Sequence, residues 1–402
     1  MIKRQWTYSF ALTALCSTQA LSHTDSEWLL PEDGLSVDFQ ASLSYRNEAL
    51  VKSSEVYRIP GTLMGGEALP SKKGLSVDEV FLVPTFRLHE TYGFMKIGRH
   101  LGSDELELDH VLVGHRVLPN LVIEGGKMAS AMTPFNGQHV LETNFTSRRL
   151  VYDALWGGQL NDEGIRLKAK FFGLETGVEL WKGDSFPARQ KESDKSAVDV
   201  YMRYHAAFGD SLLTIGAFAY EAKAELRDDD RYTAGHSHGS TLVVDPSYFS
   251  GDVSTQGAHV LYTNQLNSDW SVAAEGEIAQ MKQNGRLTDA THDAAFDSKI
   301  LGLWGDASLG YRDETLSFRS ERLKIQNDVY GSAALVLSDK LGLADADDDP
   351  YRYSLSYKHR FTPMLLSRIE WSKDSTTGDK KDVFTAGFVF NGPLYASGSP
   401  KE

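Results

Sequence analysis

The 402-residue sequence has a single cysteine, Cys16, and no run of 18 apolar residues after its N-terminal segment. One cysteine excludes an internal disulfide framework, and the missing apolar run excludes a membrane-spanning helix. The sequence also lacks a cluster of basic residues, and its formal net charge is −14. Nucleic acid is therefore excluded as an expected partner. The mean hydropathy of −0.33 is typical of a chain with much water-exposed surface.

The N-terminus has the features of an export signal. Lys3 and Arg4 precede a short apolar stretch that ends near Cys16, and Ala20-Leu21-Ser22 supplies small residues for cleavage. This order predicts a signal peptide over residues 1–22 and one exported domain over residues 23–402, which would contain no cysteine. Lipidation of Cys16 is the alternative, but Leu15 stands where a small residue is expected.

Alternation of apolar and polar residues is the dominant pattern of the remaining chain. Leu35 to Arg46 reads LSVDFQASLSYR, which gives a strand one apolar face and one polar face. Gly164 to Phe172 and Gly173 to Trp181 form a predicted hairpin across Phe172-Gly173, and Gly209-Asp210-Ser211 predicts another turn. Segments of about ten such residues recur to Phe390, as is typical of lipid-facing strands.

Short turns alternate with longer polar segments along the chain. The longer segments are Asn47–Gly74, Ser130–Ser147, Lys182–Ser196, Glu225–Gly251, Lys282–Lys299 and Leu341–Pro350. This asymmetry and the aromatic strand ends predict an all-β fold: an antiparallel transmembrane β-barrel of about 16 strands, within two either way, with short periplasmic turns and long extracellular loops. Val329 to Leu337 fits a helix or a strand. A secreted β-sandwich or propeller is the alternative fold.

The segment from Leu121 to Gly164 resembles the phosphate-selective porin O and P family. The matching positions are Gly126, Lys127 and Met128; Pro134, Phe135 and Gly137; Ser147, Arg148 and Arg149; Gly164 and Ile165. The resemblance covers about 45 residues and implies a porin barrel in a Gram-negative outer membrane. Members selective for phosphate are expected to have basic lumens, whereas this chain is acidic, so the solute stays open.

A porin-like interior predicts which side chains line the lumen. Basic residues on the polar phase of their strands, together with Asp38, are the predicted pore-lining set: Asp38, Arg87, Arg166, Lys168, Lys170, Arg203, Arg352, Lys358 and Arg360. Acidic residues Glu175, Glu179, Asp199, Glu275 and Glu277 also face inward on this pattern. Charge pairing across the wall is as compatible with it as ion selection, and the preferred sign stays open.

The Ser130–Ser147 segment is the candidate for a loop that folds inward and narrows the pore. Its predicted constriction residues, with the two arginines that follow it, are Pro134, Phe135, Arg148 and Arg149.

A second group lies in a predicted external loop: Asp228, Asp229, Asp230, His236 and His238. Imidazole and carboxylate together suit zinc or a similar divalent ion, although a solvated polar loop is the simpler explanation. Gly235-His236-Ser237-His238-Gly239 also matches the G-x-S-x-G motif of hydrolases, but it lacks the strand before and the helix after the serine.

These patterns together predict a non-enzymatic outer-membrane porin for passive diffusion of small hydrophilic solutes or ions. The alternative is an outer-membrane protein that captures divalent metal on its His/Asp-rich loops, and a barrel lipase is a third class. No cofactor is expected apart from such a loop metal. The expected partners are outer-membrane lipid, lipopolysaccharide and the solute, and a homotrimer stays open.

Overall fold

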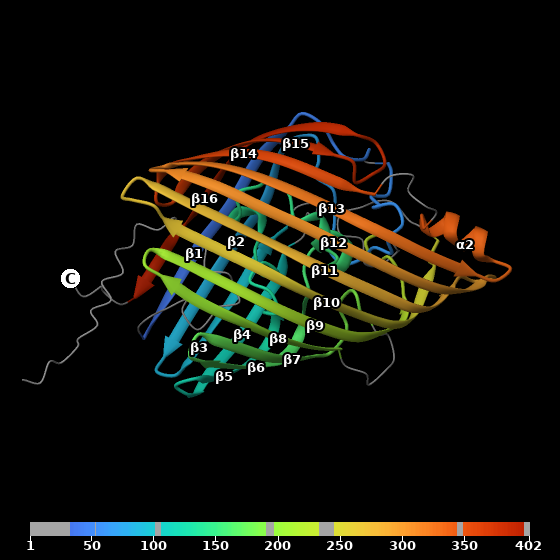
Figure 1. The fold of residues 1–402 in the computed structure, drawn as a ribbon, viewed down its shortest axis with the longest axis horizontal. Coiled ribbons are helices and arrows are strands. Elements are labelled where there is room, and N and C mark those ends of the chain that lie inside the picture. Colours follow the sequence, from blue (N-terminus) through green and yellow to red (C-terminus); the bar gives the residue numbers. More distant parts are fainter. Residues whose placement is uncertain are drawn as a thin grey trace, which may run out of the picture.

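The computed structural model describes residues 33–52, 54–100, 106–189, 197–232, 245–343 and 349–397. They form one closed antiparallel barrel in which every strand pairs with its neighbours in sequence and β1 pairs with β16 (Figure 1). The predicted transmembrane β-barrel of 16 strands is confirmed. The strands are β1 Gly34–Arg46, β2 Gly74–Leu88, β3 Thr91–Arg99, β4 Glu107–Leu118, β5 Leu121–Ala129, β6 Asn161–Phe171, β7 Leu174–Trp181, β8 Ala197–Phe208, β9 Ser211–Arg227, β10 Tyr248–Gln265, β11 Trp270–Thr288, β12 Asp293–Tyr311, β13 Glu314–Tyr330, β14 Tyr351–Thr362, β15 Leu365–Asp374 and β16 Lys381–Ser397.

The two ends of the barrel differ in their connections. At one end of the barrel, seven hairpins join their strands through two to four residues. The start of β1 and the end of β16 lie at this same end. In the β6–β7 turn Phe172 has φ 49° and Gly173 has φ 84°, the positive pair that a tight hairpin needs. The other end carries the longer connections, and α2 (Ala334–Leu341) lies beyond the extended β12 and β13 (Figure 1).

The structure corrects one predicted loop and resolves one stretch that the sequence left ambiguous. The predicted loop Lys282–Lys299 is wrong, because β11 continues to Thr288 and β12 begins at Asp293. Strands β9 to β13 contain 17 to 19 residues, against 8 to 12 in β3 to β8, so this part of the barrel extends further at the long-loop end. The ambiguous stretch after Val329 divides: β13 ends at Tyr330, and the helix α2 follows.

The outer face is apolar and the inner face is polar or packed. On β1 the exposed Leu43 and Tyr45 alternate with the buried Ser42, Ser44 and Arg46. Aromatic side chains are exposed next to the short turns, as in an interfacial girdle, among them Phe171, Phe208, Trp270, Tyr311, Phe361 and Phe388. No helix among the described residues is long and apolar enough to cross a membrane.

We predict that Leu167→Arg destabilises the barrel in lipid by about 2–4 kcal/mol, as expected for a cation near the middle of the apolar band. Leu167 is exposed and pairs on the outer face with Ile123 of β5 and Val178 of β7. Denaturant unfolding in lipid vesicles measures the loss. Phe172→Arg, at a turn tip, is the control and should cost at most about 1 kcal/mol. Equal losses at the two positions would contradict a lipid-facing band.

Candidate functional site

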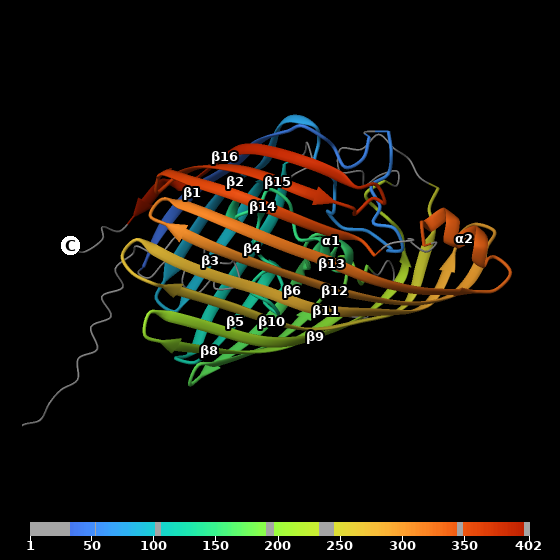
Figure 2. The ribbon, with the colours of Figure 1, turned by 45° about the horizontal axis from the view of Figure 1, so that its top comes forward.

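Residues 130–160, which connect β5 and β6, lie inside the barrel; we call them the insert. The insert contains the short helix η2 (Val140–Glu142), which contacts β1 and β2, and α1 (Leu150–Trp156), which contacts β12 and β13. Figure 2 shows α1 within the ring of strands. The insert therefore crosses the lumen from β5 to the opposite side.

Basic side chains on the opposite strands hold the carbonyl groups of the insert. Arg368 of β15 donates to three of them, those of Val140 (2.8 Å), Thr143 (3.0 Å) and Phe145 (2.8 Å). The remaining donors extend this contact along the insert: Arg46 to the carbonyl of Thr146, Arg319 to that of Ser147, Arg352 to that of Arg148, and Lys358 to the Asn144 side chain. A charged donor forms a stronger hydrogen bond than a neutral one, so these contacts fix the path of an irregular backbone.

Acidic side chains accept hydrogen bonds from the N–H and O–H groups of the insert. Glu277 of β11 accepts from the hydroxyls of Thr133 (2.8 Å) and Tyr152 (2.9 Å). Four backbone N–H groups have similar acceptors: Ala131 donates to Glu179, Leu141 to Glu79, Thr146 to Glu370 and Leu150 to Glu321. Non-helical backbone inside a membrane protein requires such internal partners, and the inner face supplies them.

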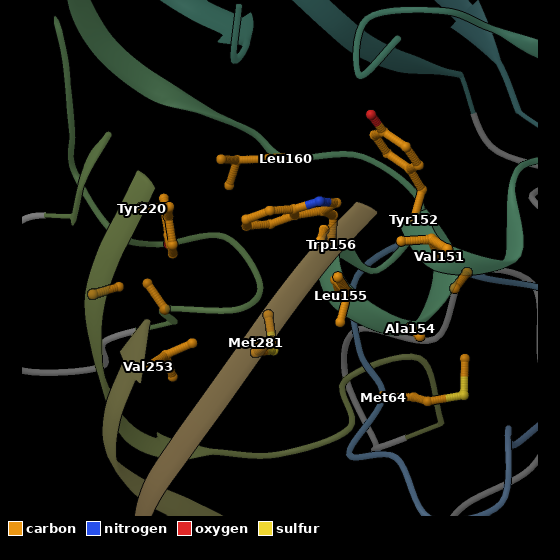
Figure 3. Close-up of a cluster of buried hydrophobic side chains, with 14 of the residues drawn as sticks. Met64, Val151, Tyr152, Ala154, Leu155, Trp156, Leu160, Tyr220, Val253 and Met281 are labelled. Carbon is orange, nitrogen blue, oxygen red and sulfur yellow. The ribbon is translucent and has the colours of Figure 1, made fainter. Parts of the chain in front are cut away.

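An apolar core joins α1 to the long strands. Trp156 is fully buried, and its ring meets Tyr220 of β9 edge-on with centroids 5.2 Å apart. Figure 3 shows Leu155 and Trp156 of α1 beside Met281, with Tyr220 and Val253 across from them. The inner face of β9 to β11 is thus partly apolar, whereas the sequence pattern predicted polar and charged residues for the inner face. Tight packing on one side and hydrogen bonds on the other keep α1 in place.

The predicted pore-lining residues all lie on the inner phase of their strands, and the deeper ones are paired. Arg166 is fully buried between Glu124 (2.8 Å) and Glu179. The other deep pairs are Lys168 with Glu124 (3.3 Å), Arg203 with Glu175 (2.5 Å), Arg352 with Glu321 (2.6 Å) and Lys358 with Asn144. Asp38, Arg87, Lys170 and Arg360 lie closer to the short-turn end and are less buried.

The predicted constriction residues anchor the insert. Phe135 is buried and meets Trp304 of β12 edge-on at 4.7 Å between ring centroids. The guanidinium of Arg149 lies over the same indole at 4.2 Å and bonds to Glu275 at 2.7 Å. Arg148 approaches Glu67 at 3.5 Å, and Pro134 is half-buried beside Phe135. These side chains lie inside the barrel, and Phe135 and Arg149 contact residues of the barrel wall.

The acidic loop predicted to capture metal is held by arginines where the structure describes it. Arg231 forms a bidentate pair with Asp229 (2.7 Å to each oxygen). Arg189 pairs with Asp230 and approaches Asp228 at 3.7 Å. His236 and His238, with the G-x-S-x-G motif around them, lie outside the described residues, so loop metal capture stays a prediction.

A hollow of about 360 Å³ opens inside the barrel near the short turns. It is lined by Arg116, Pro119, Asn120, Val122, Lys168, Ala169, Lys170 and Glu175. Three cationic side chains and one carboxylate give the lining of this hollow an excess of positive charge, although the chain as a whole is acidic. Clefts lined by one sign of charge concentrate ions of the other sign.

One group of buried side chains was missed by sequence reasoning. His100, His110 and His139 gather inside the barrel with Glu79 and Asp109. Their spacing in sequence matches no motif. They meet because the insert returns His139 to β2 and β4, and because a register shift after Ser42 turns both Asp78 and Glu79 inward.

No family model matches the sequence, and no curated protein is significantly similar to it. Solved structures share its fold. OmpF of Salmonella typhi is 10% identical, with a TM-score of 0.54 over 90% of this chain and 98% of that one. The outer-membrane channel DcaP of Acinetobacter baumannii is 11% identical, with a TM-score of 0.52 over 89% and 96%. A loop-deletion form of OmpT, an outer-membrane protein of Vibrio cholerae, is 13% identical, with a TM-score of 0.51 over 90% and 100%. At these identities the likeness shows the barrel fold alone.

Burial of α1 makes Asp153 sensitive to pH. Burial raises the pKa of the Asp153 carboxyl from 3.8 to about 6, and the nearby Arg352 and Arg148 only partly oppose this. Because the folded-state pKa lies above the unfolded one, folding favours the protonated form. The contribution of Asp153 to the free energy of unfolding is therefore fully present below about pH 3.8 and is lost as the pH rises from there to about 6.

We predict that Asp153→Asn stabilises the protein at pH 8, by at most about 3 kcal/mol, and has little effect at pH 4. Urea unfolding in lipid vesicles at the two pH values measures the difference. Asp313→Asn in an exposed turn is the control and should change neither value. A stabilisation by Asp153→Asn that is the same at both pH values would contradict a buried charge as its cause.

Proposed function

We propose that this barrel is a porin of a Gram-negative outer membrane, through which small hydrophilic solutes or ions diffuse passively. The observation that carries the proposal is an insert held inside the barrel by charged side chains, together with a hollow near the short turns whose lining is mainly basic. A barrel of 16 strands is wide enough to enclose an aqueous path. Solutes would pass beside the insert, so its position would set the width of that path. The apolar outer face would contact lipid and lipopolysaccharide.

The narrower assignment, to the phosphate-selective porin O and P family, rests on the segment from Leu121 to Gly164. Two of its glycines are required by the structure. A Cβ on Gly126 would lie 1.9 Å from the carbonyl oxygen of Val111, and one on Gly164 would lie 2.4 Å from that of Leu180. Glycine is therefore required at these two positions because any side chain there would collide with a neighbouring strand. The basic hollow supports an anionic solute, of which phosphate is one.

We predict that the purified protein gives stepwise conductance in planar bilayers, and that Arg368→Ala enlarges the unitary conductance. The variant removes a buried cation that binds three insert carbonyls, an interaction in the range of about 1.5–3 kcal/mol for a charged hydrogen bond. Ile369→Ala, on the exposed face of the same strand, is the matched control and should leave the conductance unchanged. Silence of both the wild type and Arg368→Ala, with circular dichroism showing folded barrels, would reject the pore.

Ion preference tests the basic hollow separately. We predict that Lys170→Glu shifts the reversal potential in asymmetric salt toward cation preference, because it reverses one charge at the lining of the hollow. Lys52→Glu is the control, since that side chain is exposed at the long-loop end. A shift of the same size in both variants would assign the effect to overall charge instead of to the hollow.

A further inference from the structure

Three histidines and two carboxylates form a buried cluster between the insert and the barrel wall. Glu79 belongs to β2, His100 follows β3, Asp109 and His110 belong to β4, and His139 belongs to the insert. None of the five is more than 3% exposed. Within this cluster Asp109, His110 and His139 each offer one ligand atom, and these atoms all lie within 4.8 Å of one another.

Asp109 is the centre of the cluster. Its Oδ2 lies 2.8 Å from Nδ1 of His110 and 3.2 Å from Nε2 of His139, and its Oδ1 lies 3.3 Å from Nε2 of His100. The second ring nitrogen of His139, Nδ1, lies 3.5 Å from Oε1 of Glu79. One imidazole of the insert is therefore placed between a carboxylate of β4 and a carboxylate of β2.

The Asp109–His110 contact of 2.8 Å has the length of an ordinary hydrogen bond, but the other three separations, of 3.2, 3.3 and 3.5 Å, are long for hydrogen bonds between charged groups, which are about 2.7–2.9 Å. They match the spacing of metal ligands instead. Two N or O atoms bound to one tetrahedral zinc ion at about 2.0–2.1 Å lie about 3.3 Å apart. Two buried atoms support this interpretation, because Nε2 of His100 and Oε1 of Glu79 form no hydrogen bond with any described residue. A bound water or ion is one recognised explanation for buried polar atoms of this kind.

We infer that Asp109 Oδ2, His110 Nδ1 and His139 Nε2 bind one divalent ion of the zinc type inside the barrel. Imidazole nitrogen and carboxylate oxygen are the ligands that such ions accept. Oε1 of Glu79 lies 3.5 Å from Nδ1 of His139 and would accept the proton of that nitrogen when the metal binds, which would fix the tautomer whose Nε2 faces the metal. A water would complete the coordination. This site is distinct from the predicted loop site at His236 and His238, and it does not depend on the proposed porin function.

The ion would join two parts of the chain that are far apart in sequence. His139 is the residue before η2, whereas His110 pairs with Lys96 of β3 and Asp109 lies at the register shift next to that pair. A bound ion would therefore tie the start of η2 to β4, next to the carbonyls that Arg368 holds. Binding would restrict the motion of the insert.

The test uses full-length protein folded in detergent, stripped with a chelator, and carrying His236→Ala and His238→Ala so that the loop cannot contribute. Titration with Zn²⁺ by calorimetry, and with Co²⁺ by visible absorption, should show one site per chain. His139→Ala should weaken binding by about 100-fold or more, since loss of even an outer partner of a ligand costs about 10- to 100-fold. Hydrogen exchange of the insert amides should slow when Zn²⁺ is added.

Two further variants keep the result interpretable. Glu79→Gln preserves the size of the side chain and should weaken Zn²⁺ binding by about 10- to 100-fold without unfolding the barrel. His259→Ala removes another buried inward imidazole, one that packs on Phe135, and should leave binding unchanged. Absence of saturable binding, or equal affinity in His139→Ala and His259→Ala, would overturn the site and leave a buried network of imidazoles and carboxylates as its explanation. Neither outcome depends on whether the barrel conducts.

Discussion

The structure depends on one constraint: the backbone of the insert is irregular, and every polar group that it carries into the barrel needs a partner there. The inner face meets this need with opposite charges on different strands. Arginines of β13 to β15 and β1 bind carbonyl groups, as Arg368 does for three of them, while glutamates such as Glu321 bind N–H groups. The charges of the inner face and the path of the insert are therefore mutually dependent, and removing either would leave buried groups unpaired.

Charge pairing of this kind specifies a position more than it adds stability. Burying an ion pair costs desolvation energy that its attraction roughly offsets, but breaking a buried pair leaves an uncompensated charge. Arg166, between Glu124 and Glu179, and Arg352, next to Glu321, are such pairs. The net stabilisation of α1 comes instead from apolar burial, because Trp156 and Leu155 are fully enclosed. Apolar packing thus holds the insert inside, and the charges select one placement for it.

Sequence reasoning predicted the barrel because strand alternation is local: the residues from Leu35 to Arg46 show their two faces without knowledge of any partner. The same reasoning took Lys282–Lys299 as a loop because the segment is long and polar, and nothing in the sequence shows that β11 and β12 extend beyond their neighbours. The cluster around Asp109 could not be predicted from the sequence, for a different reason. Its residues come from β2, the end of β3, β4 and the insert, which are far apart in the sequence. In addition, Glu79 faces inward because of a register shift between β1 and β2 that the alternation of residues does not predict.

Two sets of contacts act on the same short piece of the insert. Arg368 holds the carbonyls of Val140, Thr143 and Phe145 from β15, and Asp109 and Glu79 hold His139 from β4 and β2. Because η2 lies between these anchors, a change at either one alters the restraint on the other through only a few residues of backbone. Any solute path beside the insert would therefore respond to the chemistry of both, even though neither anchor needs to touch the solute. In such a barrel the width of a path is set by how the insert is attached as much as by the side chains that line it.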